Sequence, residues 1–320
     1  MPHALMRLLG PVAAVVFVAM SAPAFATAQR TFVASSGSDA NPCSIVQPCR
    51  TFAQAITQTS VGGELVALTS GGYGTITIGK SIAILAPTGV YAGVTATGGA
   101  TGITVNAGPS DVVTIRGLAI NGIGGGDGIA FNSGGMLEIE GTEVSGFNGA
   151  NKAGLHVQAV GRLFVRDSTF RDNYHGVFIE GATGKVLASL DRVNLTHNAS
   201  VGLYVVNGGA VTITNSVASG NAYGIDAQTV DGSTQLASIA VESCHVANNT
   251  QDGIVIGGYG VFPAQLPYIT VSGSVVADNG GYGMHGLHAL NYNLILSRQN
   301  NTVVGNQAGS LLMVDPLSAM

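Results

Sequence analysis

The sequence predicts an all-β protein: a single-stranded, right-handed parallel β-helix with three strands in each coil and a helical cap at its N-terminal end. Three observations lead to this prediction. Glycine accounts for 47 of the 320 residues, about twice its usual share. Charged residues make up only 9% of the chain, which leaves few for solvated helices. A motif that begins with glycine recurs every 22–30 residues, and alternating strand patterns follow it.

The composition excludes several classes of protein. Coiled coils and long solvated helices need many lysines, and this chain has three. Disordered chains are poor in apolar residues, whereas 46% of this chain is apolar. Proteins that bind nucleic acids carry a basic stripe, whereas the net charge here is −5. We therefore expect a packed core and no nucleic-acid partner.

Residues 1–28 are predicted to be a secretory signal peptide. Arg7 supplies the positive charge, an apolar stretch runs from Leu8 to Met20, and Ala26-Thr27-Ala28 offers a cleavage site. A membrane anchor is the rival interpretation, but the stretch is short for a span and Pro11 interrupts it. No later segment is a candidate span. We expect a secreted or periplasmic protein with no membrane span after removal of the signal.

Residues 29–60 are predicted to form the N-terminal cap. Cys43 and Cys49 lie six residues apart in a proline-rich loop, and in an oxidising compartment they would form a local disulfide. A metal site is the alternative, but no histidine or further cysteine is near in sequence. Residues 50–56 are apolar at positions 52, 53, 55 and 56, which predicts a short helix over the open strand edges of the first coil.

Residues 61–310 are predicted to form the parallel β-helix, and residues 311–320 a C-terminal tail over the last coil. Each coil contributes the strand of the glycine motif, a second strand and a third, shorter strand. A leucine-rich repeat would need a leucine-dense pattern, and a β-propeller would need longer blades and aromatic markers, whereas this chain has no tryptophan. The copies of the glycine motif begin at Gly102, Gly128, Gly154, Gly176, Gly202, Gly224, Gly253, Gly283 and Gly309.

The register of the coils gives structural roles to several polar residues. Cys244 falls in an inward column of small residues, which predicts a buried free thiol rather than a nucleophile. Arg116, Glu140, Arg166 and Asp191 fall at one outward position of the second strand, where they would form an exposed ladder of ion pairs. An asparagine ladder is predicted at the turn before the glycine motif, from Asn173, Asn198, Asn221, Asn249, Asn279 and Asn306.

The chain resembles the pectate-lyase-like right-handed β-helix superfamily of exported repeat proteins. The resemblance covers nearly the whole chain after the signal. Its more specific part is N-terminal: Gly37-Ser38-Asp39-Ala40-Asn41-Pro42-Cys43, then Pro48-Cys49-Arg50-Thr51-Phe52 and Gly62-Gly63-Glu64-Leu65. The superfamily includes pectate and alginate lyases, polygalacturonases, epimerases and non-catalytic surface proteins. The resemblance therefore implies the fold and leaves the activity open.

The polygalacturonase branch of the superfamily provides a specific test. Its motifs include Asp-Gly, an Asp pair on the next coil and His-Gly. Asp127 and His175 match the first and the last of these, but Lys152-Ala153 stands where the Asp pair belongs. A glycosidase needs two carboxylates as acid and base. If the protein is an enzyme, the sequence favours a polysaccharide lyase over a glycoside hydrolase.

The strand of the glycine motif presents a column of outward residues that suits a sugar chain. Phe178 and Tyr204, with Tyr223, Gln158 and Gln228 beside them, are predicted to bind substrate through stacking and hydrogen bonds. The alternative is an aromatic ladder that only stabilises the coils. The candidates for acid–base catalysis are the titratable residues of this face, His175, Asp226, Glu180 and His156.

Three aspartates of neighbouring coils form a candidate Ca²⁺ site. Asp226, Asp231 and Asp252 come from two consecutive coils and could approach one another. Ca²⁺ takes six to eight oxygen ligands, so it is a candidate cofactor only if further oxygens are present.

Together these patterns predict an exported, monomeric protein that engages extracellular polysaccharide along one parallel sheet. Whether it acts as a polysaccharide lyase is left open. The alternative function is a non-catalytic structural or adhesive surface protein, which the low charge and the missing family motifs favour. The sequence does not identify the glycan.

Overall fold

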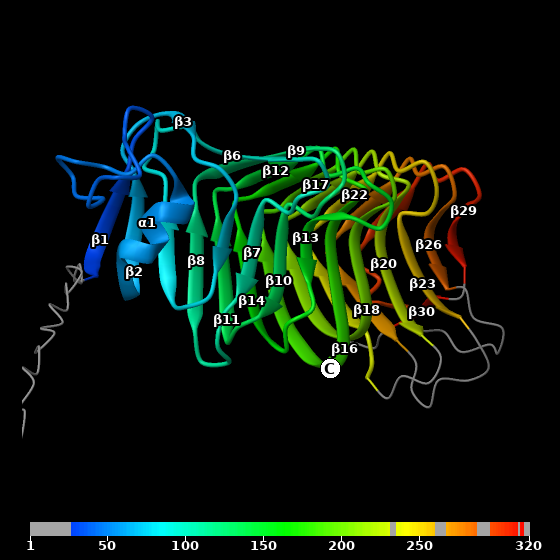
Figure 1. Cartoon of the computed structure of the whole chain (residues 1–320). Coiled ribbons are helices and arrows are strands. Elements are labelled where there is room, and N and C mark those ends of the chain that lie inside the picture. Colours follow the sequence, from blue (N-terminus) through cyan, green and yellow to red (C-terminus); the bar gives the residue numbers. More distant parts are fainter. Residues whose placement is uncertain (1–26, 231–234, 260–266, 287–294, 313, 317–320) are drawn as a thin grey trace, which may run out of the picture.

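The computed structural model describes residues 27–230, 235–259, 267–286, 295–312 and 314–316. The chain winds into successive coils of parallel strands, with one short helix at the N-terminal end (Figure 1). This is the right-handed parallel β-helix that the repeats predict. Among the described residues, no helix is long and apolar enough to cross a membrane.

Three parallel sheets form the walls of the coil, and the long strands β16 and β18 bend from the first sheet into the second. The first sheet consists of β4 (Ile76–Ile78), β7 (Ile103–Asn106), β10 (Ile129–Ser133), β13 (Ala153–Val157), the first parts of β16 (His175–Asp191) and β18 (Val201–Thr214), β20 (Tyr223–Val230), β23 (Ile254–Tyr259), β26 (Tyr282–Gly286) and β29 (Gly309–Leu312).

The second sheet contains the strand that follows in each coil. It consists of β1 (Ala28–Val33), β2 (Thr59–Ala67), β5 (Ile82–Leu85), β8 (Val112–Arg116), β11 (Met136–Glu140), β14 (Gly161–Arg166), the second parts of β16 and β18, β21 (Ser238–Glu242), β24 (Tyr268–Ser272), β27 (Ile295–Ser297) and β30 (Val314–Pro316).

The third sheet contains the short strand that completes each coil. It consists of β3 (Gly71–Gly72), β6 (Ala92–Thr97), β9 (Leu118–Ile123), β12 (Glu143–Ser145), β15 (Thr169–Arg171), β17 (Asn194–Thr196), β19 (Val217–Ser219), β22 (His245–Ala247), β25 (Val275–Ala277) and β28 (Thr302–Val304).

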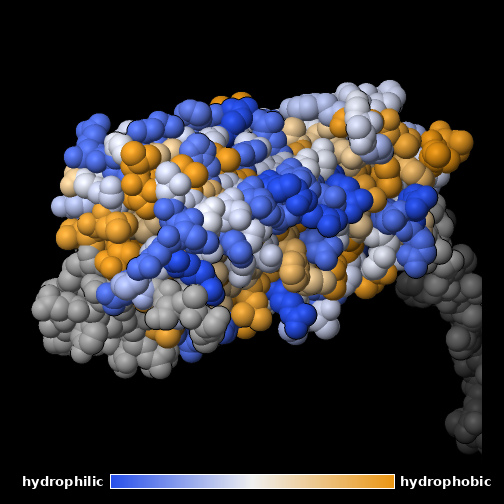
Figure 2. Space-filling model, turned by 180° about the vertical axis from the view of Figure 1, so that it is seen from behind, coloured by the Kyte–Doolittle hydropathy of each residue, from blue (hydrophilic) through white to orange (hydrophobic). Residues whose placement is uncertain are grey.

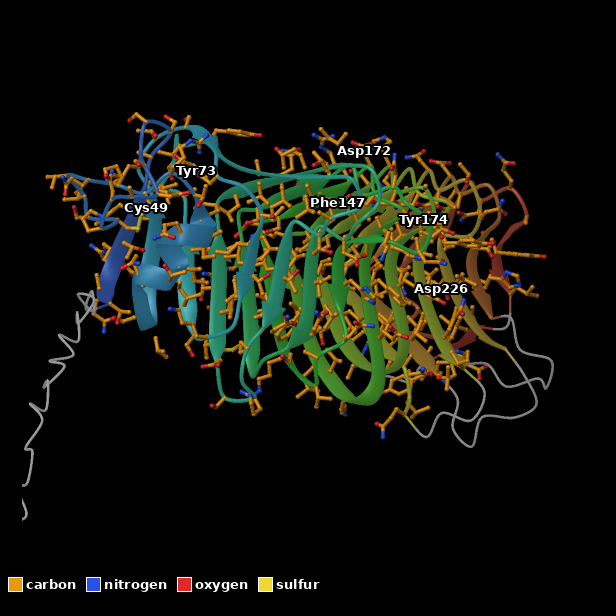
Figure 3. All side chains as sticks on the ribbon, in the orientation of Figure 1. Cys49, Tyr73, Phe147, Asp172, Tyr174 and Asp226 are labelled. Carbon is orange, nitrogen blue, oxygen red and sulfur yellow. A yellow bond between two sulfur atoms is a disulfide. The ribbon has the colours of Figure 1, made fainter. Side chains whose placement is uncertain are left out.

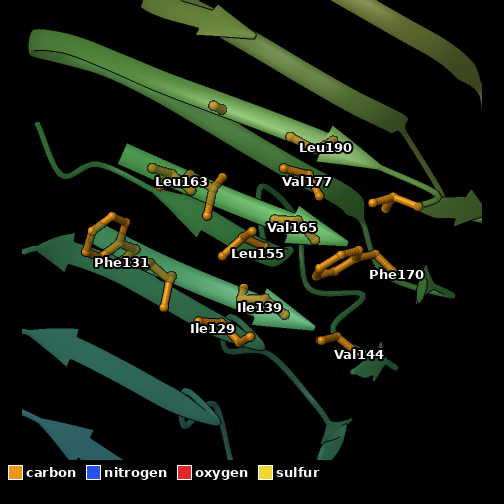
Figure 4. Packing of buried hydrophobic residues seen from close by; sticks show 14 of the residues in the cluster. Ile129, Phe131, Ile139, Val144, Leu155, Leu163, Val165, Phe170, Val177 and Leu190 are labelled. Atoms are coloured by element: carbon orange, nitrogen blue, oxygen red, sulfur yellow. The ribbon is translucent and has the colours of Figure 1, made fainter. Parts of the chain in front are cut away.

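The core is a continuous apolar column inside the three sheets. Alternate side chains of each strand point inward, so that Leu155 of the first sheet, Leu163 of the second and Phe170 of the third meet in the interior (Figure 4). All three are fully buried. This burial of apolar surface is the main stabilising contribution, at about 1.5–3 kcal/mol for each large side chain.

The turn between the third and first sheets holds the predicted asparagine ladder. Asn198 donates its Nδ2 to the carbonyl of Phe170 at 3.1 Å and accepts the backbone N–H of Asn173 on its Oδ1 at 3.1 Å. The same pattern repeats from coil to coil through Asn221, Asn249, Asn279 and Asn306. Because these asparagines satisfy backbone groups that the sharp turn removes from the sheets, they fix the stacking of the coils.

The N-terminal end carries the predicted disulfide and the short helix. Cys43 and Cys49 are bonded, with their Cα atoms 4.6 Å apart. Helix α1 (Phe52–Gln58) begins two residues later than the predicted 50–56, because the Thr51 side chain accepts the N–H of Gln54 and serves as the N-cap. The helix contacts β1, β2 and β4 and so covers this end of the core.

Strand pairing extends beyond both ends of the predicted range 61–310. Strand β1 pairs with β2, and at the other end β29 and β30 pair with β26 and β27. The described part of residues 311–320 therefore continues the first and second sheets.

The structural roles of the remaining polar columns follow the register. The Cys244 thiol is buried and free, and it donates to the carbonyl of Glu242 at 3.2 Å. Glu140 lies between Arg116 at 2.6 Å and Arg166 at 2.9 Å on the outer surface of the second sheet. Asp191, the fourth member of the predicted ladder, pairs with Arg192 instead and accepts hydrogen bonds from Thr214 and Asn215.

Candidate functional site

One column of outward residues runs along the first sheet, as the repeat register predicts. Each member lies opposite the next on the neighbouring strand, about 4.8 Å away. From β10 to β26 the column consists of Ala130, His156, Phe178, Tyr204, Asp226, Val255 and His285.

Three rings of this column stack on one another. The centroids of His156 and Phe178 are 4.7 Å apart with planes inclined by 13°, and those of Phe178 and Tyr204 are 5.0 Å apart at 15°. The ring of His175 flanks the stack, 5.5 Å from Phe178 and 5.2 Å from Tyr204. Because the rings face one another, the stack presents their edges to the surface, where Phe178 and Tyr204 are half-buried.

Charged residues surround the N-terminal end of the stack. His156 lies between two carboxylates: its Nδ1 is 3.6 Å from Asp127 Oδ2, and its Nε2 is 3.5 Å from Glu180 Oε2. Lys152 Nζ is 3.6 Å from the same oxygen of Asp127, and Gln158 donates to Glu180 at 3.1 Å. Burial alone would raise the pKa of Asp127, but the nearby His156 and a hydrogen bond from the backbone N–H of Ala153 outweigh it and lower that pKa.

His175 is a neutral imidazole beside the stack. It is 5% exposed, and its Nδ1 has no hydrogen-bond partner among the described residues. Burial, reinforced by the nearby His156, lowers the pKa of His175 to about 4. At pH 7 this side chain is therefore uncharged and can accept or donate a hydrogen bond.

Asp226 lies at the C-terminal end of the stack, in the C-terminal half of the solenoid (Figure 3). Its Oδ2 accepts a hydrogen bond from Gln228 at 2.8 Å, and Gln228 in turn accepts one from the Tyr204 hydroxyl at 2.9 Å. Its Oδ1 has no partner among the described residues. Burial, with 5% of the residue exposed, raises the pKa of Asp226 to about 7, and the charge of Asp252 adds to this effect.

Asp252 and His285 form a pair that sequence reasoning did not predict. His285 Nδ1 lies 2.8 Å from Asp252 Oδ2, and the other oxygen of Asp252 accepts the backbone N–H of Tyr282 at 2.6 Å. The two residues were recognised separately, one as a possible metal ligand and one as a member of the outward column. The two residues are 33 positions apart in the sequence, which is more than one coil. Asp252 lies opposite Tyr282 in the register, and His285 is three residues further along the same strand.

The predicted Ca²⁺ site stays a prediction, because the described residues contain only part of it. Asp231 lies outside the described residues, and both oxygens of Asp252 are engaged by His285 and Tyr282. Within the described part of the chain, no three His, Cys, Asp or Glu residues are grouped so that they could hold a metal ion.

The four predicted acid–base residues fall into two groups. His156, His175 and Glu180 lie around the N-terminal end of the stack, whereas the rings of Phe178 and Tyr204 separate Asp226 from His156. Tyr223 lies at the start of β20, opposite Val201 and thus outside the column of the stack. Asp127 and Lys152 were considered only as family motif positions, although their coil register with His156 could have indicated the contact.

The comparisons with known proteins identify the class of protein. Residues 101–315 match the family model described as a right handed beta helix region, so the chain belongs to this family. A search among curated proteins found no match.

Solved structures with the same fold include three enzymes. A pectate lyase has a TM-score of 0.61 and 16% identity over 91% of this chain and 80% of its own. An alginate lyase from Paenibacillus sp. has a TM-score of 0.56 and 14% identity over 90% of this chain and 100% of its own. The A-module of a mannuronan C-5 epimerase from Azotobacter vinelandii has a TM-score of 0.52 and 14% identity, over 81% of this chain and 92% of its own. These structures show that the chain has the pectate-lyase-like β-helix fold.

Proposed function

We propose that this is an exported protein that binds an extracellular polysaccharide along the first sheet. The observation that carries the proposal is the stack of His156, Phe178 and Tyr204, which is continuous over three coils and half-buried. The row of half-buried ring edges gives the C–H groups of sugar rings an apolar surface to contact. The stack follows the axis of the solenoid, so an extended sugar chain would lie across the strands.

Polar groups at both ends of the stack support this proposal. Glu180, Gln158 and Lys152 at one end, and Gln228 at the other, offer hydrogen-bond partners for sugar hydroxyls. The disulfide between Cys43 and Cys49 fits an oxidising compartment. The structures of similar fold are named for pectate, alginate and mannuronan, so uronate polymers are the first glycans to test.

The binding test compares the mature chain with a Phe178→Ala/Tyr204→Ala variant on pectate and alginate. Loss of both rings should raise the dissociation constant at least about tenfold, because each removes an apolar contact surface. Tyr91→Ala, an exposed aromatic on the third-sheet side, is the matched control and should bind as the unsubstituted chain does. Equal binding by the double variant would contradict the proposal and favour the structural or adhesive alternative.

A second candidate function, lyase chemistry on the same polymer, rests on Asp226. A lyase removes the C5 proton of a uronate, the C4–O bond breaks, a C4=C5 double bond forms and the leaving oxygen takes up a proton. A base works best when its pKa lies near the working pH, and the pKa of Asp226 is about 7. Its Oδ1 is buried and makes no hydrogen bond to the described residues, so this function requires the uronate to reach a buried oxygen.

The catalytic test follows the ultraviolet absorbance of unsaturated uronates. Asp226→Asn keeps the shape of the side chain and should abolish turnover while the dissociation constant for the polymer stays within about threefold. Absence of turnover by the unsubstituted chain, together with binding that depends on Phe178 and Tyr204, would establish a non-catalytic glycan-binding protein.

A further inference from the structure

A groove of about 450 Å³ lies on the outer surface of the second sheet, away from the stack of the first sheet. On the face shown in Figure 2, apolar surface occurs in patches between polar residues. Three exposed apolar residues line the groove: Leu187, which is 46% exposed, and the aromatic residues Phe164 and Tyr268, each 43% exposed. The volume is in the range of pockets that bind small ligands.

The walls and the floor of the groove follow from the register of five strands. Phe164 stands on β14 and Tyr268 on β24, and β16, β18 and β21 lie between them. Four strand spacings of about 4.8 Å separate the two aromatic residues, or about 19 Å. At these outward positions the strands between them present Leu187, next to Arg162, and otherwise small residues such as Ala210 and Ala240. The groove is therefore a trough with an aromatic wall at each end.

Hydroxyl groups line the floor of this trough. Ser189, Thr212 and Ser238 point to the outer surface on three consecutive strands. Among the described residues, none of these three hydroxyls makes a side-chain hydrogen bond, in contrast to Ser216, which bonds to the carbonyl of Thr214 at 2.7 Å. They are available to a polar ligand.

Arg162 gives the groove a positive charge. Its neighbours in the register are Met136 and Leu187, so no acidic residue lies beside it on either adjacent strand. Arg162 is exposed and makes no ion pair within the described ranges, whereas Arg166 on the same strand is paired with Glu140 at 2.9 Å. A carboxylate is the natural partner for this guanidinium because it can accept two parallel hydrogen bonds.

We propose that this groove is a second glycan-binding site, which takes a short oligosaccharide that bears a carboxylate. Arg162 binds the carboxylate, Phe164 and Tyr268 pack against sugar rings at the two ends, and the hydroxyls of the floor bond to the sugar. An apolar peptide would use the aromatic walls but would leave Arg162 and the hydroxyls without partners. The inference does not depend on the function proposed for the first sheet.

The test uses the mature chain that carries Phe178→Ala/Tyr204→Ala, which separates this groove from the first sheet. Tetragalacturonate and its methyl ester are titrated by calorimetry. In this background, Arg162→Gln should weaken the binding of tetragalacturonate about tenfold and leave the ester unchanged, because the lost contact is to the charge. Phe164→Ala or Tyr268→Ala should weaken both ligands, and Tyr91→Ala should weaken neither.

Three outcomes would overturn the proposal. The first is the absence of binding by the background variant to either probe. The second is an equal effect of Arg162→Gln on the acid and on the ester. The third is a dimer in analytical ultracentrifugation that Phe164→Ala dissociates, because the groove would then be covered by a second copy of the chain. Thermal unfolding of each variant checks the fold, and these exposed substitutions should leave it intact.

Discussion

The Nδ1 of His285 lies 2.8 Å from the Oδ2 of Asp252, a residue that belongs to the preceding coil. The second oxygen of Asp252 accepts the backbone N–H of Tyr282 at 2.6 Å. One carboxylate therefore fixes both the start of β26 and the orientation of an imidazole on the outer face of the first sheet.

Replacement of Asp252 by alanine should destabilise the C-terminal coils. The substitution leaves the N–H of Tyr282 and the ring of His285 without their acceptor, and a group that loses its partner in this way costs about 1–3 kcal/mol. We expect the free energy of unfolding to fall by about 2 kcal/mol, as measured by chemical denaturation. Glu143→Ala, which breaks an exposed ion pair with Arg171, should change it by less than about 1 kcal/mol. Equal effects of the two variants would show that Asp252 does not fix the coils.

Asp226 should make the protein less stable as the pH rises from about 4 to 7. Its pKa is about 7 in the folded chain and 3.8 in the reference state, so over this range the unfolded chain ionises and the folded chain does not. The shift of about three pKa units corresponds to at most about 4 kcal/mol. Asp226→Asn should remove this dependence, so the melting temperatures of variant and unsubstituted chain should differ most at pH 8. Parallel pH profiles would contradict the raised pKa.

His175 should have the opposite effect on the pH dependence. Its pKa is lowered from 6.5 to about 4 in the folded chain. Between pH 4 and 6.5 this histidine is therefore protonated in the unfolded chain and neutral in the folded chain. Stability should therefore decrease as the pH falls from 6.5 to 4, and His175→Gln should flatten this part of the profile. Melting temperatures at pH 4.5 and pH 7 test the prediction. A profile of the variant that is as steep as before would rule out a neutral buried imidazole.

The asparagine ladder should contribute more to stability than the exposed asparagines of the same coils. Asn221 donates to the carbonyl of Leu195 and accepts the N–H of Asn198, both at 2.9 Å and both buried. Asn221→Ala should lower the free energy of unfolding by about 3 kcal/mol, because buried groups in two coils lose their partners. Asn194→Ala, on an exposed strand position, should lower it by less than about 0.5 kcal/mol. Similar losses of unfolding free energy in the two variants would mean that the hydrogen bonds of the ladder do not stabilise the stacking of the coils.

The fold and the outward column could be predicted because the glycine motif sets the register of the coils. Once the glycines are aligned, period-2 alternation determines that His156, Phe178 and Tyr204 stand side by side. No long-range information beyond the repeat is needed for this step, since each coil stacks only on the two adjacent coils.

Contacts that leave this register could not be predicted in the same way. The bond between Asp252 and His285 crosses from the start of one strand to the middle of the next, and so it depends on side-chain orientation. The burial of Asp226 depends on what surrounds an outward position, which alternation alone does not specify. The groove of the second sheet was not predicted, because Ser189 and Thr212 are ordinary residues for a strand. The groove forms because the bulky side chains of Phe164 and Tyr268 stand at its two ends.

The asparagine ladder has a consequence for how such a chain can change in length. From Asn173 to Asn306 each coil offers its neighbour the same acceptor and the same donor at the turn, so the joint between two coils is nearly the same throughout this part of the chain. Loss or duplication of one whole repeat would leave that joint intact, whereas insertion of a single residue within a strand would turn its inward side chains outward. The coil is thus the natural unit for genetic gain and loss, and for an engineer who wishes to shorten or extend the protein.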